Sequence, residues 1–141
     1  MNTTARSPLA AIQRAIYQRL SGDAELGADV YDEVDEDATY PYVRIGEATA
    51  SPRNWLTGFG WSTTHTLHVW SAQRAFDEAN DIVDRLVQLL DHQALDLADD
   101  TWDVTSVTFE FSQTLTDPHP PHARHVPIRF RIDTEQPEDE E

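Results

Sequence analysis

The residues best suited to metal chemistry are three histidines that recur at intervals of three near the C-terminal end. They are His119, His122 and His125, and imidazole is the commonest protein ligand of zinc. The prolines between the first two enforce an extended chain, which separates successive side chains instead of converging them. His65 and His68 stand an odd number of residues apart on a predicted strand, so they face opposite sides and cannot share an ion. We therefore expect solvated or interface histidines, with a metal hydrolase as the remotest alternative.

Other catalytic and cofactor-binding patterns are missing from the sequence. The acidic run 32–37 lacks the central glycine and the distal glutamate of an EF-hand calcium loop. Gly58-Phe59-Gly60 has neither the third glycine nor the lysine of a phosphate-binding loop. Without cysteine there is no thiol nucleophile and no disulfide. Carboxylates are abundant, but none belongs to a recognisable acid–base motif. We expect no enzyme activity and no cofactor.

The charge of the chain indicates the kind of solvent to which its surface is adapted. Its 141 residues include 26 acids against ten basic residues, all of them arginine, for a net charge of −16. Such a surface does not wrap DNA or sit on an anionic membrane. Two interpretations remain open, a halophilic protein of a salt-rich cytoplasm and an acidic mimic of nucleic acid. The complete loss of lysine favours the first, because a mimic has no reason to discard lysine while keeping arginine.

The periodicity of apolar residues predicts two helices and five strands. Residues 9–20 carry apolar side chains at helical spacing until Ser21-Gly22-Asp23 ends the run, and residues 73–92 carry the longest such stripe. The predicted strands are 30–34, 40–47, 63–71, 104–112 and 124–133. Their inward residues are expected to be Val43, Ile45, His65, Leu67, Val69, Val107, Phe109, Phe111, Val126, Ile128, Phe130 and Ile132.

Residues 48–61 interrupt this pattern with an aromatic-rich loop. Proline and glycine break regular structure there, yet the segment contains four large apolar residues, Trp55, Leu56, Phe59 and Trp61. They could cover the core of the domain or be offered to a partner. Because the segment lies between two strands, we expect an extended loop or hairpin arm that offers its apolar residues to a partner.

The order of the elements predicts the fold class and the domain limits. Short connections favour an α+β fold, with an antiparallel sheet of four to five strands and both helices on one face. Pro127 lacks an amide donor, which suggests an edge position for its strand. We expect one domain over residues 1–134 and a disordered acidic tail over 135–141. No membrane span or secretory signal is expected, so synthesis in the cytoplasm is the default.

Several segments together resemble the tail terminator, or tail completion, proteins of tailed viruses. The resemblance covers about residues 9–132. Its most specific element is the strand Tyr40-Pro41-Tyr42-Val43-Arg44-Ile45-Gly46-Glu47. The supporting segments are Leu9-Ala10-Ala11-Ile12, Ile16-Tyr17, Arg19-Leu20, Val30-Tyr31-Asp32, Thr66-Leu67-His68-Val69-Trp70-Ser71, Val107, Phe109-Glu110, Thr114-Leu115, Asp117-Pro118 and His125-Val126-Pro127-Ile128-Arg129-Phe130-Arg131.

This resemblance implies a structural role in a virion. Such proteins form a homohexameric ring that caps the tail tube and joins the tail to the head completion, or stopper, protein at the neck. The implied partners are further copies of the chain, the tail tube protein, the stopper protein and, as a further candidate, the tape measure protein. DNA would pass through the lumen without specific binding. Together with the acidity, the resemblance points to a haloarchaeal tailed virus. The alternatives are another neck component, such as a stopper or adaptor, and an acidic DNA-mimic inhibitor.

Overall fold

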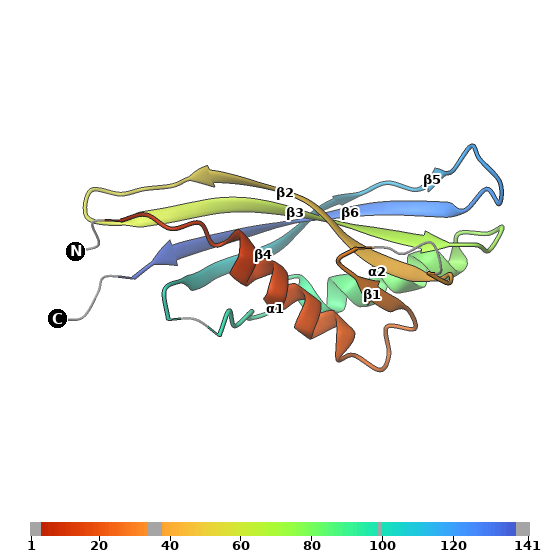
Figure 1. Cartoon of the computed structure of the whole chain (residues 1–141), viewed down its shortest axis with the longest axis horizontal. Coiled ribbons are helices and arrows are strands. Elements are labelled where there is room, and N and C mark those ends of the chain that lie inside the picture. Colours follow the sequence, from red (N-terminus) through yellow and green to blue (C-terminus); the bar gives the residue numbers. More distant parts are fainter. Residues whose placement is uncertain (1–3, 34–37, 99, 138–141) are drawn as a thin grey trace.

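One β-sheet with two helices on one of its faces makes up the protein (Figure 1). The computed structural model describes residues 4–33, 38–98 and 100–137. Over these residues the elements are α1 (Leu9–Ser21), β1 (Asp29–Tyr31), β2 (Tyr42–Pro52), β3 (Phe59–Ser71), α2 (Asp77–Leu90), β4 (Asp103–Ser112), β5 (Leu115–Thr116) and β6 (Arg124–Gln136). The predicted α+β fold with both helices on one face is therefore confirmed.

The strands lie in the order β1-β2-β3-β6-β4, and β5 pairs with β6 beyond the end of β4. All neighbouring pairs are antiparallel except β1 and β2, which run parallel. The purely antiparallel sheet that we expected is corrected on this point. A parallel pair needs a connection that carries the chain back to the same end, and residues 32–41 supply it. The first strand occupies 29–31 rather than 30–34, and residue 34 lies outside the described residues.

The core lies between the helices and the inward face of the sheet, largely where the alternation of apolar residues predicted it. At least 96% of the surface of each of the following side chains is buried: Ile12, Ile16, Leu20, Val43, Ile45, Leu67, Val69, Ile82, Leu86, Leu90, Val107, Val126, Ile128, Phe130 and Ile132. Fully burying a side chain of this size contributes about 1.5–3 kcal/mol. No helix among the described residues is both long and apolar enough to cross a membrane.

Helix α2 is shorter than the predicted 73–92 at both ends. Before it, Ser71 Oγ donates to Glu78 Oε1 at 2.7 Å and Gln73 Nε2 donates to Glu78 Oε2 at 3.0 Å, which holds the entering segment in a turn. After Leu90, Asp91 is extended, and its Oδ1 accepts the backbone amide of Phe109 at 2.8 Å. Side-chain bonds to the backbone of a neighbouring strand thus end the helix earlier than apolar spacing alone suggests.

The expected loop over residues 48–61 is largely strand. β2 continues to Pro52 and β3 begins at Phe59, so together they form a long hairpin with a short turn. The register runs from Ala48 opposite His65 to Pro52 opposite Trp61, after a bulge between Ile45 and Ala48. Proline is tolerated here because this part of β2 is the edge of the sheet among the described strands.

Pro127 does not mark an edge strand, because β6 lies between β3 and β4. Its carbonyl accepts the amide of Gln113 at 3.2 Å, so its backbone polar side faces the β4 side of the strand. β4 ends at Ser112 and β5 begins only at Leu115, so the proline lies opposite a gap between the two strands. The missing donor therefore costs no ladder hydrogen bond.

Phe109 and Phe111 are not buried as predicted, since they are 38% and 39% exposed. A bulge between them shifts the register, so Phe109 pairs with the inward Phe130 but Phe111 pairs with the outward Arg129. Phe109 contacts the Phe130 ring edge-to-face at 6.0 Å from its place at the margin of the sheet. The guanidinium of Arg129 lies 4.6 Å from the centre of the Phe111 ring on the opposite face. Alternation therefore fails because a bulge adds a residue to one strand.

The disordered acidic tail was predicted to begin at residue 135, which is too early, because β6 extends to Gln136. Glu135 and Gln136 belong to β6, and Gln136 is 5% exposed. Its amide group accepts from the Arg6 backbone at 3.1 Å and donates to the Thr4 carbonyl at 2.9 Å, so it joins the two ends of the chain. The rest of the predicted tail, from residue 138, lies outside the described residues.

Candidate functional site

The turn that joins β2 and β3 carries the most exposed apolar side chain of the described residues. Trp55 and Gly58 exchange backbone hydrogen bonds of 3.1 and 3.3 Å around Leu56 and Thr57, which closes a two-residue turn. At the top of this turn Leu56 is 99% exposed, and Trp55 is 43% exposed. The turn is therefore rigid in its backbone and offers a large aliphatic group entirely to solvent.

The four predicted contact residues do not form one patch. Trp55 lies over Gly58 and Gly60, where an added Cβ would be 2.3 and 3.2 Å from its ring. Phe59 and Trp61 are half-buried in β3 at positions that alternate with Gly60, so they point to the opposite face of the sheet. The structure thus brings Trp55 and Leu56 together at the tip, whereas Phe59 and Trp61 belong to β3, and Trp61 lines a hollow that Trp55 also lines.

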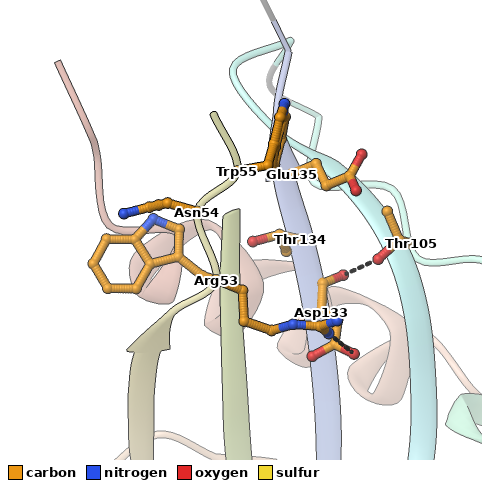
Figure 2. Close-up of a pocket in the computed structure, with 8 residues that line it drawn as sticks. Arg53, Asn54, Trp55, Thr105, Asp133, Thr134 and Glu135 are labelled. Atoms are coloured by element: carbon orange, nitrogen blue, oxygen red, sulfur yellow. Dashed lines mark hydrogen bonds and ion pairs between the residues drawn. The ribbon is translucent and has the colours of Figure 1, made fainter. Parts of the chain in front are cut away.

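A hollow of about 380 Å³ lies beside the tip (Figure 2). Its lining residues come from the turn, β3, β4 and β6, and they are Arg53, Asn54, Trp55, Trp61, Thr105, Asp133, Thr134 and Glu135. Arg53 reaches across β3 and its Nη1 lies 3.0 Å from Asp133 Oδ2. Arg53 also donates its backbone amide to the Gly60 carbonyl at 2.7 Å. The guanidinium thus ties the tip to the sheet.

Asp133 is held as a carboxylate by its neighbours. Its Oδ1 accepts from Arg131 Nε at 3.2 Å and its Oδ2 from Ser106 Oγ at 3.1 Å. Burial alone would raise the pKa of Asp133, but hydrogen bonds from Ser62, Arg131 and Ser106 outweigh it and lower the pKa. A carboxylate surrounded by donors in this way is a poor proton acceptor.

The histidines fall into separate environments. His119 and His122 lie exposed in the turn after β5, where their Nδ1 atoms are each 3.3 Å from an oxygen of Asp117. His125 instead lies in β6, and its Nε2 is 2.7 Å from Nδ1 of His68. His65 points into the core, as expected from its odd spacing to His68. Over the described ranges no three histidine, aspartate or glutamate side chains converge in a metal-binding group.

His68 and His125 belong to a cluster on the helix-free face of the sheet that sequence reasoning missed. Trp70 stacks on His125 with ring centres 3.9 Å apart and planes 4° apart, and Tyr42 stacks on Trp70 at 6.4 Å. On the other side, Nε2 of His68 is 3.0 Å from Glu47 Oε2. Burial, the adjacent His68 and Arg44 together lower the pKa of His125 to about 4.

The signal for this cluster was present in the outward positions of three strands. Tyr42 pairs with Trp70, and Trp70 pairs with His125, across neighbouring strands. Only the strand order, with β3 between β2 and β6, turns these distant residues into one row. Without that order, the outward aromatic residues read as isolated surface side chains.

Comparisons with known proteins agree on one family. The sequence model of the family "Tail completion protein gp17" matches residues 14–135. The chain is 31% identical over 88 residues to the tail completion protein gp17 of Bacillus phage SPP1, an alignment over 60% of this chain and 65% of the phage protein. The chain thus spans just under two thirds of that relative.

A solved structure shares the fold. It is a chain of the virion of a native gene transfer agent (GTA) particle, with a TM-score of 0.82 and 23% sequence identity over 93% of this chain and 99% of that one. At this identity the likeness concerns the fold alone. The family match itself covers nearly the whole domain and agrees with the resemblance of residues 9–132. The chain therefore belongs to the tail completion protein gp17 family, structural proteins of the virion tail.

Proposed function

We propose that this protein completes the tail of a tailed virus by closing into a homohexameric ring that joins the tail to the head at the neck. The observation that carries the proposal is membership of the tail completion family over residues 14–135. The ring would contact the tail tube protein on one side and the stopper protein on the other. DNA would pass through its lumen without being gripped, in keeping with a net charge of −16.

The composition supports a haloarchaeal host. Ten arginines and no lysine accompany 26 acids, and concentrated salt would screen the repulsion among so many carboxylates. Assembly would take place in the host cytoplasm, and the finished protein would reside in the virion.

We further propose that the hairpin tip is one of the ring or tail contacts. A side chain that is 99% exposed contributes nothing to the core, so Leu56 gains buried area only when a partner covers it. Its setting on a turn closed by two backbone hydrogen bonds limits the entropy lost on binding. Trp55 beside it supplies the aromatic area typical of interface hot spots.

Ring formation can be tested by light scattering in molar potassium chloride, with and without the tail tube protein. We expect a mass of six chains, and a chain that stays monomeric with tail tube protein added would refute the proposed function. For the tip, Leu56→Ser should weaken assembly without lowering the melting temperature. Tyr17→Ser is the matched control, since Tyr17 is also an exposed apolar residue but lies on α1. Equal assembly of both variants would exclude the tip as a contact.

A further inference from the structure

One part of the helix-free face of the sheet brings aromatic and basic side chains close together, although Glu47, Glu110 and Asp133 also lie on this face. We call it the bare face and define it by six outward residues of β2, β3 and β6: Tyr42, Arg44, His68, Trp70, His125 and Arg129. Cross-strand pairing places them together, since Tyr42 lies opposite Trp70, Arg44 opposite His68, and Trp70 opposite His125. Neither α1 nor α2 packs on these side chains, because both helices share the core on the other face.

The centre of the bare face is a flat aromatic row. The rings of Tyr42, Trp70 and His125 stack in succession, and His68 continues the row through its 2.7 Å contact with His125. The outward positions of β3 from Ser62 to Trp70 contain no acidic residue.

Arg44 at the edge of this row has Glu47 as its neighbouring anion, whose pKa it helps to lower, but the two side chains form no direct ion pair. Among the described residues no carboxylate lies within ion-pair distance of it, although Arg129 and Arg131 have such partners in Glu110 and Asp133. Its side chain is half-buried. A partly desolvated guanidinium gains most from a carboxylate that approaches in the plane of its donors. The bare face therefore presents, beside its aromatic row, a cation that has no direct ion pair among the described residues.

The outer face of α2 carries negative charges that complement the positive charge of Arg44 on the bare face. Asp77, Asp81 and Asp84 are exposed along this helix, and neither Asp77 nor Asp81 has an arginine or histidine within ion-pair distance over the residues described. A hollow of about 370 Å³ beside them is lined by Glu25, Leu26, Gly27, Gln73, Asp77, Glu78, Asp81 and Ile82. Because α2 covers the opposite side of the sheet, its carboxylates point away from the bare face of the same chain.

We propose that the bare face of one copy binds the outer face of α2 of a second copy, with Arg44 paired to Asp77 or Asp81. A contact between two different patches is heterologous, so its repetition generates a ring when the rotation closes. The aromatic row supplies the apolar centre, and the arginine and aspartates supply the orientation. This inference rests on the proposed ring, but it names the two surfaces that form it.

A charge exchange tests the pairing. Arg44→Glu and Asp81→Arg should each reduce the mass in light scattering from six chains to one, and the chain that carries both substitutions should assemble again. Arg14→Glu and Asp103→Arg, at exposed positions of α1 and β4, are the controls with the same changes of charge. Circular dichroism identifies any variant that has not folded. In that case the neutral variants Arg44→Gln and Asp81→Asn replace the charge reversals.

Cysteine cross-linking provides a second test, because the chain has no cysteine. Thr66→Cys lies on the outward side of β3, and Asn80→Cys lies at an exposed position of α2 beside the proposed aspartates, which it leaves in place. An equimolar mixture of the two variants should give a covalent dimer with a short bis-maleimide, whereas Asp103→Cys mixed with Asn80→Cys should not.

The outcomes separate the two proposals. Single reversals that assemble like the unchanged chain, or an absent cross-link in a mixture that forms rings, would overturn the pairing and leave the ring intact. Reversals that keep the ring but lose binding of the tail tube protein would assign the bare face to that partner and overturn self-docking. An unchanged chain that never assembles would refute the proposed function itself.

Discussion

The hydrogen bonds of two buried polar side chains, Thr63 and His65, show where their protons lie. Thr63 Oγ1 donates to the Ile132 carbonyl at 2.8 Å and lies 3.0 Å from Nε2 of His65. A hydroxyl has one proton, so Thr63 must accept from His65, whose Nε2 therefore carries a proton. His65 is 3% exposed, and its burial lowers its pKa to about 4. Sequence alternation predicted that His65 points inward, but not this network, because it depends on the β3–β6 register.

His65 and His125 make stability depend on pH. Their folded pKa of about 4 lies below the reference value of 6.5, so the unfolded chain binds protons more readily. Their contribution is complete above pH 6.5 and is lost as the pH falls toward 4. For His65 the total loss is about 3 kcal/mol. Chemical denaturation at fixed salt between pH 7.5 and 4 should show this decline, and His65→Gln should flatten it; a variant with the same slope would contradict the assignment.

Two buried threonines provide a matched pair. Thr134 is 2% exposed and its hydroxyl has no partner among the described residues, whereas the Thr63 hydroxyl bonds twice. Thr134→Val should leave the free energy of unfolding unchanged or raise it by up to about 1 kcal/mol, since an unpaired buried group is removed. Thr63→Val should lower it by about 1–3 kcal/mol, because two buried partners lose a hydrogen bond. Equal effects in urea denaturation would show that burial alone decides the outcome.

At the scale of elements, the apolar periodicity predicts the existence of most elements but not their ends. Both helices follow from their stripes, yet α2 stops at Leu90 because Asp91 bonds to a distant strand. The hairpin of β2 and β3 was partly hidden, since Pro52 and Gly58 resemble loop residues. They belong instead to an edge strand and a tight turn. Of the predicted contact residues, Trp55 and Leu56 lie together for this reason, whereas Phe59 and Trp61 belong to a strand.

Glycine at position 58 lets Trp55 fold back on its own hairpin. A methyl group there would lie 2.3 Å from the indole, so Gly58→Ala must displace that ring. We expect a loss of about 1 kcal/mol, in the range of lost packing for one partly exposed aromatic residue. Trp55 fluorescence, taken as the difference from Trp55→Phe, should shift to the red. Thr57→Ala at the same turn is the control, and an unshifted spectrum in Gly58→Ala would contradict the packing.

At the scale of the whole molecule, arginine side chains form multiple contacts between elements for which lysine is less suited. Arg85 forms a forked contact with Asp23 at 2.7 and 2.9 Å, and Arg19 donates to the carbonyls of Leu89 and Ala94 at the end of α2. These bonds join α1, α2 and the segments that follow each of them. Planar guanidinium groups serve such multiple contacts better than a single ammonium. Composition alone had shown the bias without showing where the ten cations are used.

The same surplus of acid predicts a dependence on salt. With a net charge of −16, the folded chain repels itself, and screening lowers this cost as the Debye length falls from about 10 Å at 0.1 M salt to about 3 Å at 1 M. The melting temperature should therefore rise steadily between 0.1 and 1 M potassium chloride. Scanning calorimetry measures the change, and a melting temperature that is flat or falling over this range would contradict halophilic adaptation.

The bonds between Gln136 and the backbone of residues 4 and 6 bring both ends of the fold to one place, near the hairpin tip (Figure 1). The first and last residues of the described fold are therefore neighbours in space. Joining the two ends and reopening the chain at the exposed turn between β5 and β6 would leave every strand whole and every strand neighbour unchanged. A circular permutant of this kind would carry its new termini away from the tip, and it would free that end for labels or partners.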